Sequence, residues 1–417
     1  MTRILKAIFH QTRRTIARLW LKLHPNVVII GVTGSYGKTS TVQAIAKALG
    51  GQLKTITTDI NLDTIYNLPI TLLKINHQTQ VLILEYGIDH QGEMDKHLQL
   101  VKPDIAILTG ITPVHSEADL LGSLENIMRE KSKLIGAAGN GKIFINGDDP
   151  YNKKIAAKLT KKFFTYGTDK KANFRADNIQ LNKQGLSLTA HFNHQKREIT
   201  TKLLGKHFNQ EIMAAIAIAS LLKINLDQVI QNLNELTPLK GRMSLEKGPK
   251  NSLLINDSLR ASPQSTIAGL KTLSDIPHQG QKIAVLGEMG ELGQYQDQEH
   301  YRIGKIIPKL NIDYLVTIGP ATKMIIRGAV ENGFPQNNAF ETKNVHQAVT
   351  CFNKLLDSKT LWYLKGSLLK HLERILMILR GEKVACRRVS CHNYYHCSQC
   401  PLLTKHKTQN TKFKNKI

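Results

Sequence analysis

A short apolar run that passes directly into a glycine-rich loop constrains the fold of this chain most strongly. Residues 27–32 read VVIIGV, which is typical of a buried parallel strand, and TGSYGKTS follows at 33–40. Residues 42–49 then have helical spacing, so the loop lies at a helix N-terminus, where backbone N–H groups favour anions. This order of strand, loop and helix predicts a phosphate-binding loop.

The residue types within the loop fit ATP. Gly34 and Gly37 allow a backbone with positive φ, so that successive N–H groups can face a polyphosphate. Lys38 supplies a positive charge to the β and γ phosphates, and the Thr39 hydroxyl can hold Mg²⁺. The predicted nucleotide-binding residues are Gly34, Ser35, Gly37, Lys38, Thr39 and Ser40.

The loop departs from the pattern G-x-x-x-x-G-K-[ST], because Val32 stands where the first glycine is required. The form T-G-S-x-G-K-T-S instead resembles the Mur ligase family of ATP-dependent peptidoglycan enzymes and their folylpolyglutamate synthetase relatives. The resemblance implies an ATP-dependent ligase.

The length of the chain and the placement of its charge indicate two folded domains between basic ends. The chain has 417 residues and a net charge of +25, and much of that charge lies at its two ends. We expect an α/β protein with a P-loop central domain built on a parallel sheet and a C-terminal Rossmann-like domain. The expected parts are a basic amphipathic helix at 1–26, a central ATPase domain at 27–241, the Rossmann-like domain at 242–380 and a basic cysteine-containing tail at 381–417.

Two readings of residues 1–26 remain open. Apolar residues fall mostly on one helical face, with six Lys and Arg and no acid around them. Such a helix can lie in the interface of an anionic membrane, or it can pack its apolar stripe on the domain behind it. No run of apolar residues approaches the roughly 20 that span a bilayer, and we expect no cleavable leader. We expect a cytoplasmic protein. If the helix lies in a membrane interface, we expect the protein to associate peripherally with the inner face of the membrane.

Acidic and imidazole side chains follow two apolar runs in the central part. Val81–Leu84 ends in Glu85, and Ile105–Leu108 leads to His115. Because the carboxyl ends of parallel strands line the crevice that holds the phosphate loop, we expect a Mg²⁺ site there.

Longer stretches make the resemblance more specific. Residues 68–73, 85–94, 109–115 and 122–125 resemble the Mur ligases that add D-alanyl-D-alanine. In that family, the residues matching Glu85 and His115 hold Mg²⁺. A family lysine on the following helix is carbamylated and provides a further ligand, which by register is Lys131, with Lys133 as the second choice. The implied metal ligands are therefore Thr39, Glu85, His115 and Lys131.

The resemblance assigns further nucleotide contacts. It implies that Asn146 frames the adenine, that Arg242 reaches the ATP phosphates and that Asp257 meets the ribose. The predicted catalytic residues are Lys38, Lys131, His115 and Arg242. The family usually has asparagine where this chain has Phe208 and Glu211.

The tail contains Cys386, Cys391, Cys397 and Cys400. A C-x-x-C in a reduced compartment favours a structural Zn²⁺ site over a disulfide. The alternative is a disordered basic tail with incidental thiols.

We predict an amide-bond-forming ligase that works through an acyl phosphate, with ATP and Mg²⁺, and joins an amino acid or dipeptide to a peptidoglycan precursor. With 26 residues before the loop, we expect the family's N-terminal UDP-binding domain to be missing. The alternatives are a folylpolyglutamate-synthetase-like ligase and a non-ligating nucleotide-binding adaptor for membrane or nucleic acid. A complete metal site argues against the adaptor, and we do not expect nucleic acid as a partner.

Overall fold

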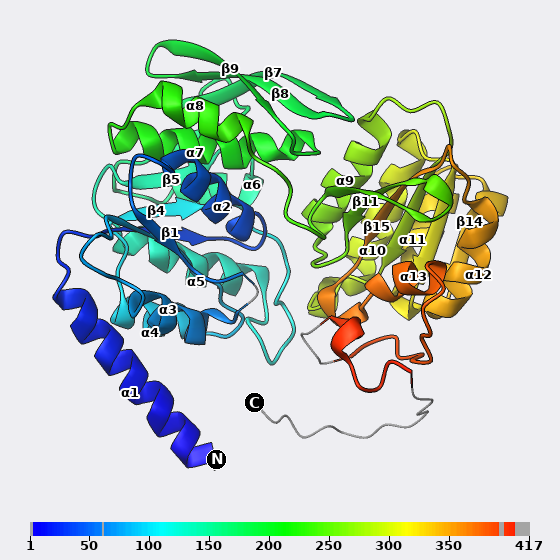
Figure 1. Ribbon diagram of the computed structural model, residues 1–417, viewed down its shortest axis with the longest axis horizontal. Coiled ribbons are helices and arrows are strands. Elements are labelled where there is room, and N and C mark those ends of the chain that lie inside the picture. The colour runs from blue at the N-terminus through cyan, green and yellow to red at the C-terminus, as the bar shows by residue number, and fades with distance from the viewer. Residues whose placement is uncertain (1–2, 61, 392–395, 405–417) are drawn as a thin grey trace. The chain divides into compact units, whose positions relative to one another are not determined.

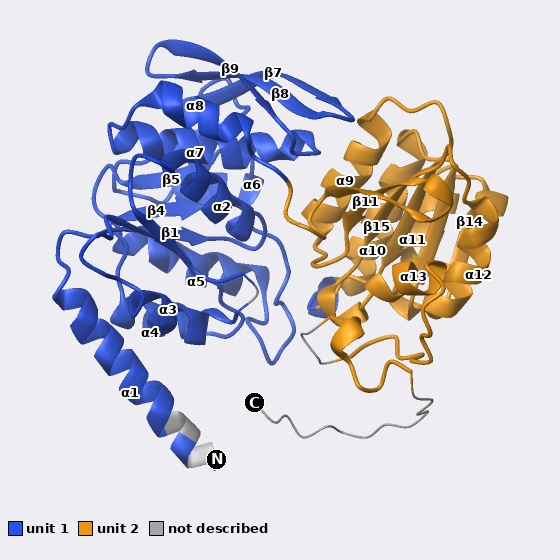
Figure 2. Cartoon of the chain, viewed as in Figure 1, with its two compact units in different colours: residues 1–237, 291–295 blue, residues 238–290, 296–417 orange. Residues whose placement is uncertain are grey.

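The computed structural model describes residues 3–60, 62–391 and 396–404. The chain forms two compact units (Figure 2). Unit 1 comprises residues 1–237 and 291–295, and unit 2 comprises residues 238–290 and 296–417. The predicted boundary after residue 241 falls just inside unit 2.

Unit 1 is built on a nine-stranded sheet within the described residues, in the order β2-β3-β1-β4-β5-β6-β7-β8-β9 (Figure 1). Strands β2 to β7 pair in parallel, and β8 and β9 extend the sheet as an antiparallel meander. The strands are β1 (Val28–Thr33), β2 (Thr55–Thr57), β3 (Val81–Glu85), β4 (Ile105–Leu108), β5 (Ile143–Asn146), β6 (Phe164–Gly167), β7 (Phe174–Asn182), β8 (Gly185–Phe192) and β9 (Gln195–Thr201).

Helices cover both faces of this sheet, as parallel strands buried on both sides require. One face packs against α3, α4 and α5 through a continuous apolar core, and α2, α7 and α8 lie together on the other (Figure 1). The helices are α2 (Lys38–Leu49), α3 (Thr64–Leu72), α4 (Glu93–Leu100), α5 (Leu124–Ala137), α6 (Pro150–Ala156), α7 (Asn209–Leu221) and α8 (Leu226–Asn234).

Helix α1 (Arg3–Lys22) packs against α3 and α4 of unit 1, but not through its apolar stripe. Ala17 is buried there, and the Trp20 indole N–H donates to the Ile75 carbonyl at 3.0 Å. The large apolar side chains of the stripe are exposed: Leu5, Ile8, Phe9, Ile16, Leu19 and Leu23. Apart from Trp20, the described part of the stripe therefore does not pack on the domain, although the helix itself does.

Unit 2 has a six-stranded sheet within the described residues, in the order β10-β11-β15-β12-β13-β14. Only β10 runs antiparallel to its neighbour, which gives the Rossmann-like arrangement that the apolar runs predict. The strands are β10 (Ser244–Lys247), β11 (Leu253–Asp257), β12 (Lys282–Gly287), β13 (Tyr314–Ile318), β14 (Ala339–Thr342) and β15 (Leu361–Lys365). The helices are α9 (Pro263–Asp275), α10 (Gln296–Ile306), α11 (Lys323–Glu331), α12 (Val345–Leu355) and α13 (Glu373–Leu379).

None of the helices in the described residues combines the length and apolar character that a membrane crossing requires. Residues 392–395 and 405–417 of the predicted basic tail lie outside the described residues.

Candidate active site

The phosphate loop joins β1 to α2, as predicted. Gly34 has φ of 151°, and a Cβ there would lie 2.0 Å from the Thr109 hydroxyl oxygen. Gly37 has φ of 76° and precedes α2 with no side chain capping the helix. A side chain at position 34 would clash with Thr109, and the positive φ at both positions favours glycine. The first N–H groups of α2 are left without a side-chain cap.

Lys38 begins α2 and remains at the loop. Its ammonium donates a hydrogen bond of 2.9 Å to the Gly34 carbonyl, four residues earlier. The positive charge is thus held against the same backbone that carries the uncapped N–H groups. This arrangement suits a polyphosphate anion.

Two oxygen groups meet beside the loop. The Thr39 hydroxyl donates to the Glu85 carboxylate at 2.8 Å. Glu85 is opposite Val32 in the parallel pairing of β3 with β1, so the end of β3 is fixed next to the loop. A hydroxyl and a carboxylate are ligands that Mg²⁺ prefers, and this pair fits the predicted metal role.

Lys131 is fully buried on α5, and its amine has no hydrogen-bond partner among the described residues. Burial and the positive charge of Lys38 lower its pKa well below the usual value for lysine, although Glu85 acts in the opposite direction. The amine is therefore close enough to Lys38 and Glu85 to be influenced by both, and it favours the neutral form. Lys133 instead forms ion pairs of 2.6 Å with Asp95 and Glu130.

His115 is held by two polar contacts. It has φ of 71°, its Nδ1 lies 2.8 Å from the Ile88 carbonyl, and its Nε2 lies 3.1 Å from a Glu291 carboxylate oxygen. Glu291 belongs to the short segment 291–295 of unit 1. Sequence reasoning missed this partner because nothing in the local pattern links residues so far apart.

Asn146 lies fully buried at the end of β5. Its amide donates to the Thr109 carbonyl at 2.7 Å and its oxygen accepts from the Asp148 N–H at 3.0 Å. Both ends of its side chain thus hold the loops at the carboxyl ends of the strands.

Sequence reasoning also missed the contacts of Tyr36, whose hydroxyl donates to Asp149 at 2.9 Å. This side chain lies so close to Gly110 that a Cβ there would be 2.2 Å from its ring. Glu211 of α7 lies near Gly37, whose Cβ position is 3.4 Å from the Glu211 carboxylate. Burial raises the pKa of Glu211 to about 8. Both residues therefore shape the loop's surroundings.

In unit 2, Asp257 ends β11 in a buried polar group. Its carboxylate accepts from Lys365 at 2.6 Å and from the Tyr363 hydroxyl at 3.0 Å. Burial raises the pKa of Asp257, while the positive charges of Lys365 and Arg242 oppose the change. Arg242 is thus near enough to Asp257 to influence its pKa, and the nucleotide roles of both residues remain predictions.

The four tail cysteines do not form one cluster. Cys391 hydrogen-bonds to His371, and the Cys397 sulfur lies within 4.8 Å of a His371 ring nitrogen. Cys386 lies 3.5 Å from an Arg374 nitrogen, and Cys400 packs beside an apolar cluster. The structure therefore brings two of the four together, with residues that the cysteine spacing did not indicate.

Comparison with protein families gives two matches. Residues 32–219 match the Mur ligase middle domain, and residues 241–368 match the domain described as Mur ligase, glutamate ligase domain.

Two relatives are named UDP-N-acetylmuramoyl-tripeptide–D-alanyl-D-alanine ligase. The one from Bacillus subtilis is 32% identical over 73% of this chain, and the match spans 65% of that enzyme. The one from Buchnera aphidicola is 30% identical over 82% of this chain and spans 72% of that enzyme. This chain thus spans about two thirds of the length of these relatives.

Solved structures share the fold. MurF from Acinetobacter baumannii superposes with a TM-score of 0.81 at 24% identity, covering 89% of this chain and 81% of the other. The MurF ligase from Thermotoga maritima in complex with ADP superposes with a TM-score of 0.77 at 21% identity. The match covers 89% of this chain and 84% of the other.

Proposed function

This chain belongs to the Mur ligase family, and from that premise we propose that it adds a D-alanyl-D-alanine-like amine to a carboxyl group of a peptidoglycan precursor at the expense of ATP. The observation that supports this most is the grouping of Lys38, Thr39, Glu85 and Lys131 around one phosphate loop. A nucleotide-binding adaptor would have little use for this set.

The reaction proceeds in two steps. A carboxylate oxygen of the precursor attacks the γ-phosphorus of ATP, ADP leaves, and an acyl phosphate forms. The amine then attacks the acyl carbon, loses a proton, and releases inorganic phosphate as the amide forms. Lys38 provides positive charge for the transferred phosphoryl group. The contact of Arg242 with the ATP phosphates, which the family resemblance implies, stays a prediction.

Thr39 and Glu85 would hold Mg²⁺, with His115 and a modified Lys131 as the further ligands. When bound, Mg²⁺ neutralises the charge that develops on the phosphate oxygens.

Lys131 carries a carbamate in the active enzyme. Its buried amine favours the neutral form, which is the form that attacks CO₂. The N–C bond forms, one proton is released, and a buried amine without a partner becomes a carboxylate-like group beside Glu85 and Lys38. The same burial argues for this residue over Lys133, whose ammonium is paired with two carboxylates.

The test of function is dual substrate dependence. We expect ADP and phosphate to form only when ATP, Mg²⁺, UDP-N-acetylmuramoyl-tripeptide and D-alanyl-D-alanine are all present, with the amide product detected by mass spectrometry. Product formed with a folate and glutamate instead would favour the folylpolyglutamate-like alternative. ATP binding with no ligation of either pair would favour the adaptor.

The apolar stripe of α1 supports a peripheral site on an anionic membrane. Ile16 and Leu19 are 51% and 54% exposed, although α1 is fixed to the domain by its other face. Helix α1 carries basic residues and no acid, which complements anionic lipid headgroups. In this arrangement the enzyme works at the inner face of the membrane, where its precursor is membrane-proximal.

Sedimentation with anionic vesicles tests this partner in the full chain. We expect salt-sensitive binding that is lost in an Ile16→Glu and Leu19→Glu variant. A Gln11→Glu and Thr15→Glu variant makes the same charge change outside the stripe and should retain most of the binding. Equal loss in both variants, or no binding of the wild type, would contradict the membrane proposal.

A further inference from the structure

The chain after α13 folds back on that helix with little regular structure. The N–H groups of Ala385 and Cys386 both donate to the Leu403 carbonyl, at 2.7 and 3.2 Å, which closes the segment into a loop. The buried apolar residues here are few: Met377, Cys397 and Leu403. So small a core stabilises a segment weakly, and such segments in other proteins are commonly held by metals or disulfides.

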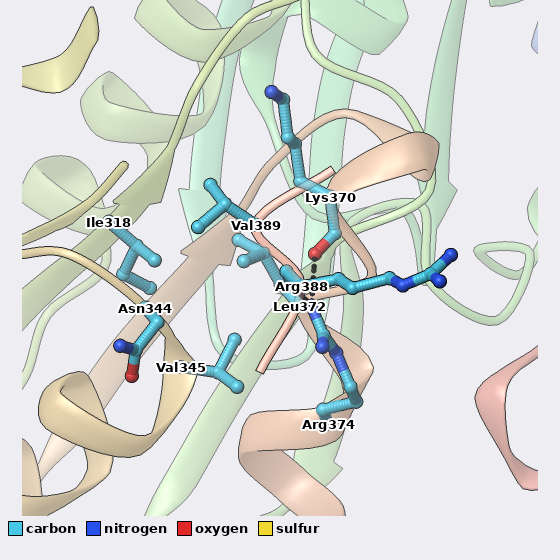
Figure 3. A pocket seen from close by; sticks show the side chains of 8 residues that line it. All are labelled: Ile318, Asn344, Val345, Lys370, Leu372, Arg374, Arg388 and Val389. Carbon is cyan, nitrogen blue, oxygen red and sulfur yellow. Dashed lines mark hydrogen bonds between the residues drawn. The ribbon is translucent and has the colours of Figure 1, made fainter. Parts of the chain in front are cut away.

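A buried arginine holds the start of this segment. Arg374 is 1% exposed, and its guanidinium donates to the carbonyls of His371, Lys370, Cys386 and Arg388. Figure 3 shows its side chain directed at the Lys370 carbonyl. Among the described residues, no carboxylate forms an ion pair with Arg374. Its positive charge is therefore compensated only by dipoles, and it favours a negatively charged group nearby.

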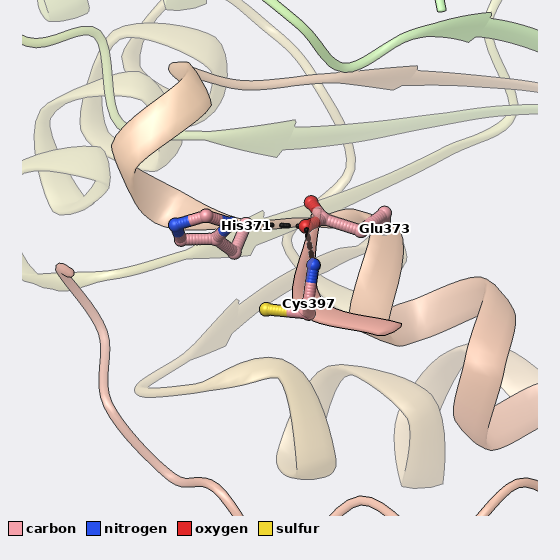
Figure 4. Close-up of side chains that lie close together, drawn as sticks. All are labelled: His371, Glu373 and Cys397. Atoms are coloured by element: carbon pink, nitrogen blue, oxygen red, sulfur yellow. Dashed lines mark hydrogen bonds and ion pairs between the residues drawn. The ribbon is translucent and has the colours of Figure 1, made fainter. Parts of the chain in front are cut away.

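Metal-binding side chains converge next to this arginine. The ligand atoms of His371, Glu373 and Cys397 all lie within 4.8 Å of one another (Figure 4). His371 Nδ1 is 2.9 Å from a Glu373 carboxylate oxygen, and the Cys391 thiol also hydrogen-bonds to His371. Donor atoms of three kinds, an imidazole nitrogen, a carboxylate oxygen and a thiol sulfur, thus face one another at the start of α13.

The backbone places these donors firmly. The Cys397 N–H donates to the Glu373 carboxylate at 3.2 Å, and the Cys391 N–H donates to the Leu369 carbonyl at 2.8 Å. His371 has φ of 50° in the turn that precedes α13. The backbone N–H groups of both cysteines thus bind residues in or beside the turn at 369–373, although the cysteines lie about 20 residues later in the chain.

We propose that His371, Glu373, Cys391 and Cys397 bind one zinc ion, which fastens the folded-back segment to α13. Two sulfurs, one imidazole nitrogen and one carboxylate oxygen are a tetrahedral donor set that zinc accepts, and thiolates select zinc over magnesium or calcium. With all four positions filled by protein, the site is structural and has no open position for a substrate.

Charge balance supports this assignment. As the metal bonds form, the two thiols each release a proton to solvent, His371 binds as a neutral imidazole, and no electron is transferred. Two thiolates, one carboxylate and Zn²⁺ leave one net negative charge, which the Arg374 guanidinium neutralises. The site therefore also satisfies the buried arginine.

Metal content of the purified full chain tests the proposal. We expect one zinc per chain by elemental analysis, and loss of that zinc in Cys391→Ser and Cys397→Ser. The matched controls are Cys400→Ser and Cys351→Ser, which remove a thiol outside the proposed donor set and should retain zinc. In metal-stripped wild-type protein, added Co²⁺ should give thiolate-to-cobalt absorption bands, and zinc should protect residues 381–404 from proteolysis.

Glu373→Gln keeps the shape of the side chain, so it tests the site even where a cysteine variant fails to fold. We expect its zinc affinity to fall at least about tenfold in competition with a chromophoric chelator. Absence of zinc and of cobalt–thiolate bands in reduced wild-type protein would overturn the proposal. Full zinc retention in Cys397→Ser would do the same.

Discussion

The hydroxyl of Thr39 donates a 2.8 Å hydrogen bond to the carboxylate of Glu85, and this bond joins the phosphate loop to the neighbouring strand. The pairing of β1 with β3 sets Glu85 opposite Val32, immediately before the loop. Glu85 is therefore held by a central strand of a buried sheet, and Thr39 is held by the first turn of α2. Such a site is largely preformed before ATP binds.

Lys38→Ala should lower ATP-dependent phosphate release by orders of magnitude, because it removes the ammonium held in the loop and leaves the core intact. Lys47→Ala is the matched control, since Lys47 lies on the same helix and pairs with Glu235 on the surface. Circular dichroism should show both variants folded. Wild-type turnover by a folded Lys38→Ala protein would show that the loop does not handle the phosphates.

Lys131→Ala should abolish ligation, and acetate should restore part of it, because the proposal requires a negative group at this position. Lys133→Ala should remain active, since that ammonium is already paired with Asp95 and Glu130. The readout is amide product with and without acetate. If Lys133→Ala is the inactive variant, the carbamate has been assigned to the wrong lysine.

Gly34→Ala should destabilise unit 1 by about 1–3 kcal/mol, because the new Cβ meets Thr109 and φ is unfavourable for alanine. Gly136→Ala on α5 is the control. Its Cβ meets nothing within 4 Å, and alanine favours the helix. Thermal melting should separate the two variants. A Gly34→Ala melting temperature equal to that of Gly136→Ala would contradict the loop geometry.

The raised pKa of Glu211 predicts that the stability of the fold depends on pH. Its pKa is raised from 4.5 to about 8 in the folded chain, so the folded state keeps a proton that the unfolded state has lost. Stability from this group is therefore present below pH 4.5 and falls as pH rises toward 8. Glu211→Gln should gain melting temperature relative to wild type between pH about 5 and about 8. A difference that does not change with pH would show that Glu211 is ionised in the folded state.

The local sequence pattern was sufficient to predict the α/β fold and the residues that follow directly after buried strands. The apolar runs before Gly34 and Glu85 predict two strands that the structure contains, and the resemblance to the Mur ligase family is confirmed. The placement of Lys131 came from the resemblance. The spacing of α5 also favours it over Lys133, because Ile127, Leu134 and Ile135 stand three or four residues from Lys131 on the buried face. The predicted roles of the site residues and of Mg²⁺ remain predictions.

Contacts between distant residues could not be predicted. Glu291 contacts His115 only because the fold brings residues 291–295 back to unit 1. In the same way, the chain after α13 folds back and brings Cys397 to His371 and Glu373. Helix α1 shows a further limit. An apolar stripe commonly indicates the packed face, but here the small side chain of Ala17 packs inward while Leu19 remains exposed.

Isotope transfer tests the acyl-phosphate mechanism most directly. A precursor whose reacting carboxyl group carries ¹⁸O is incubated with the enzyme, ATP, Mg²⁺ and D-alanyl-D-alanine, and the released phosphate is examined by mass spectrometry. We predict one ¹⁸O in each phosphate formed, because the attacking carboxylate oxygen leaves with the phosphoryl group. Amide formation with unlabelled phosphate would contradict the mechanism.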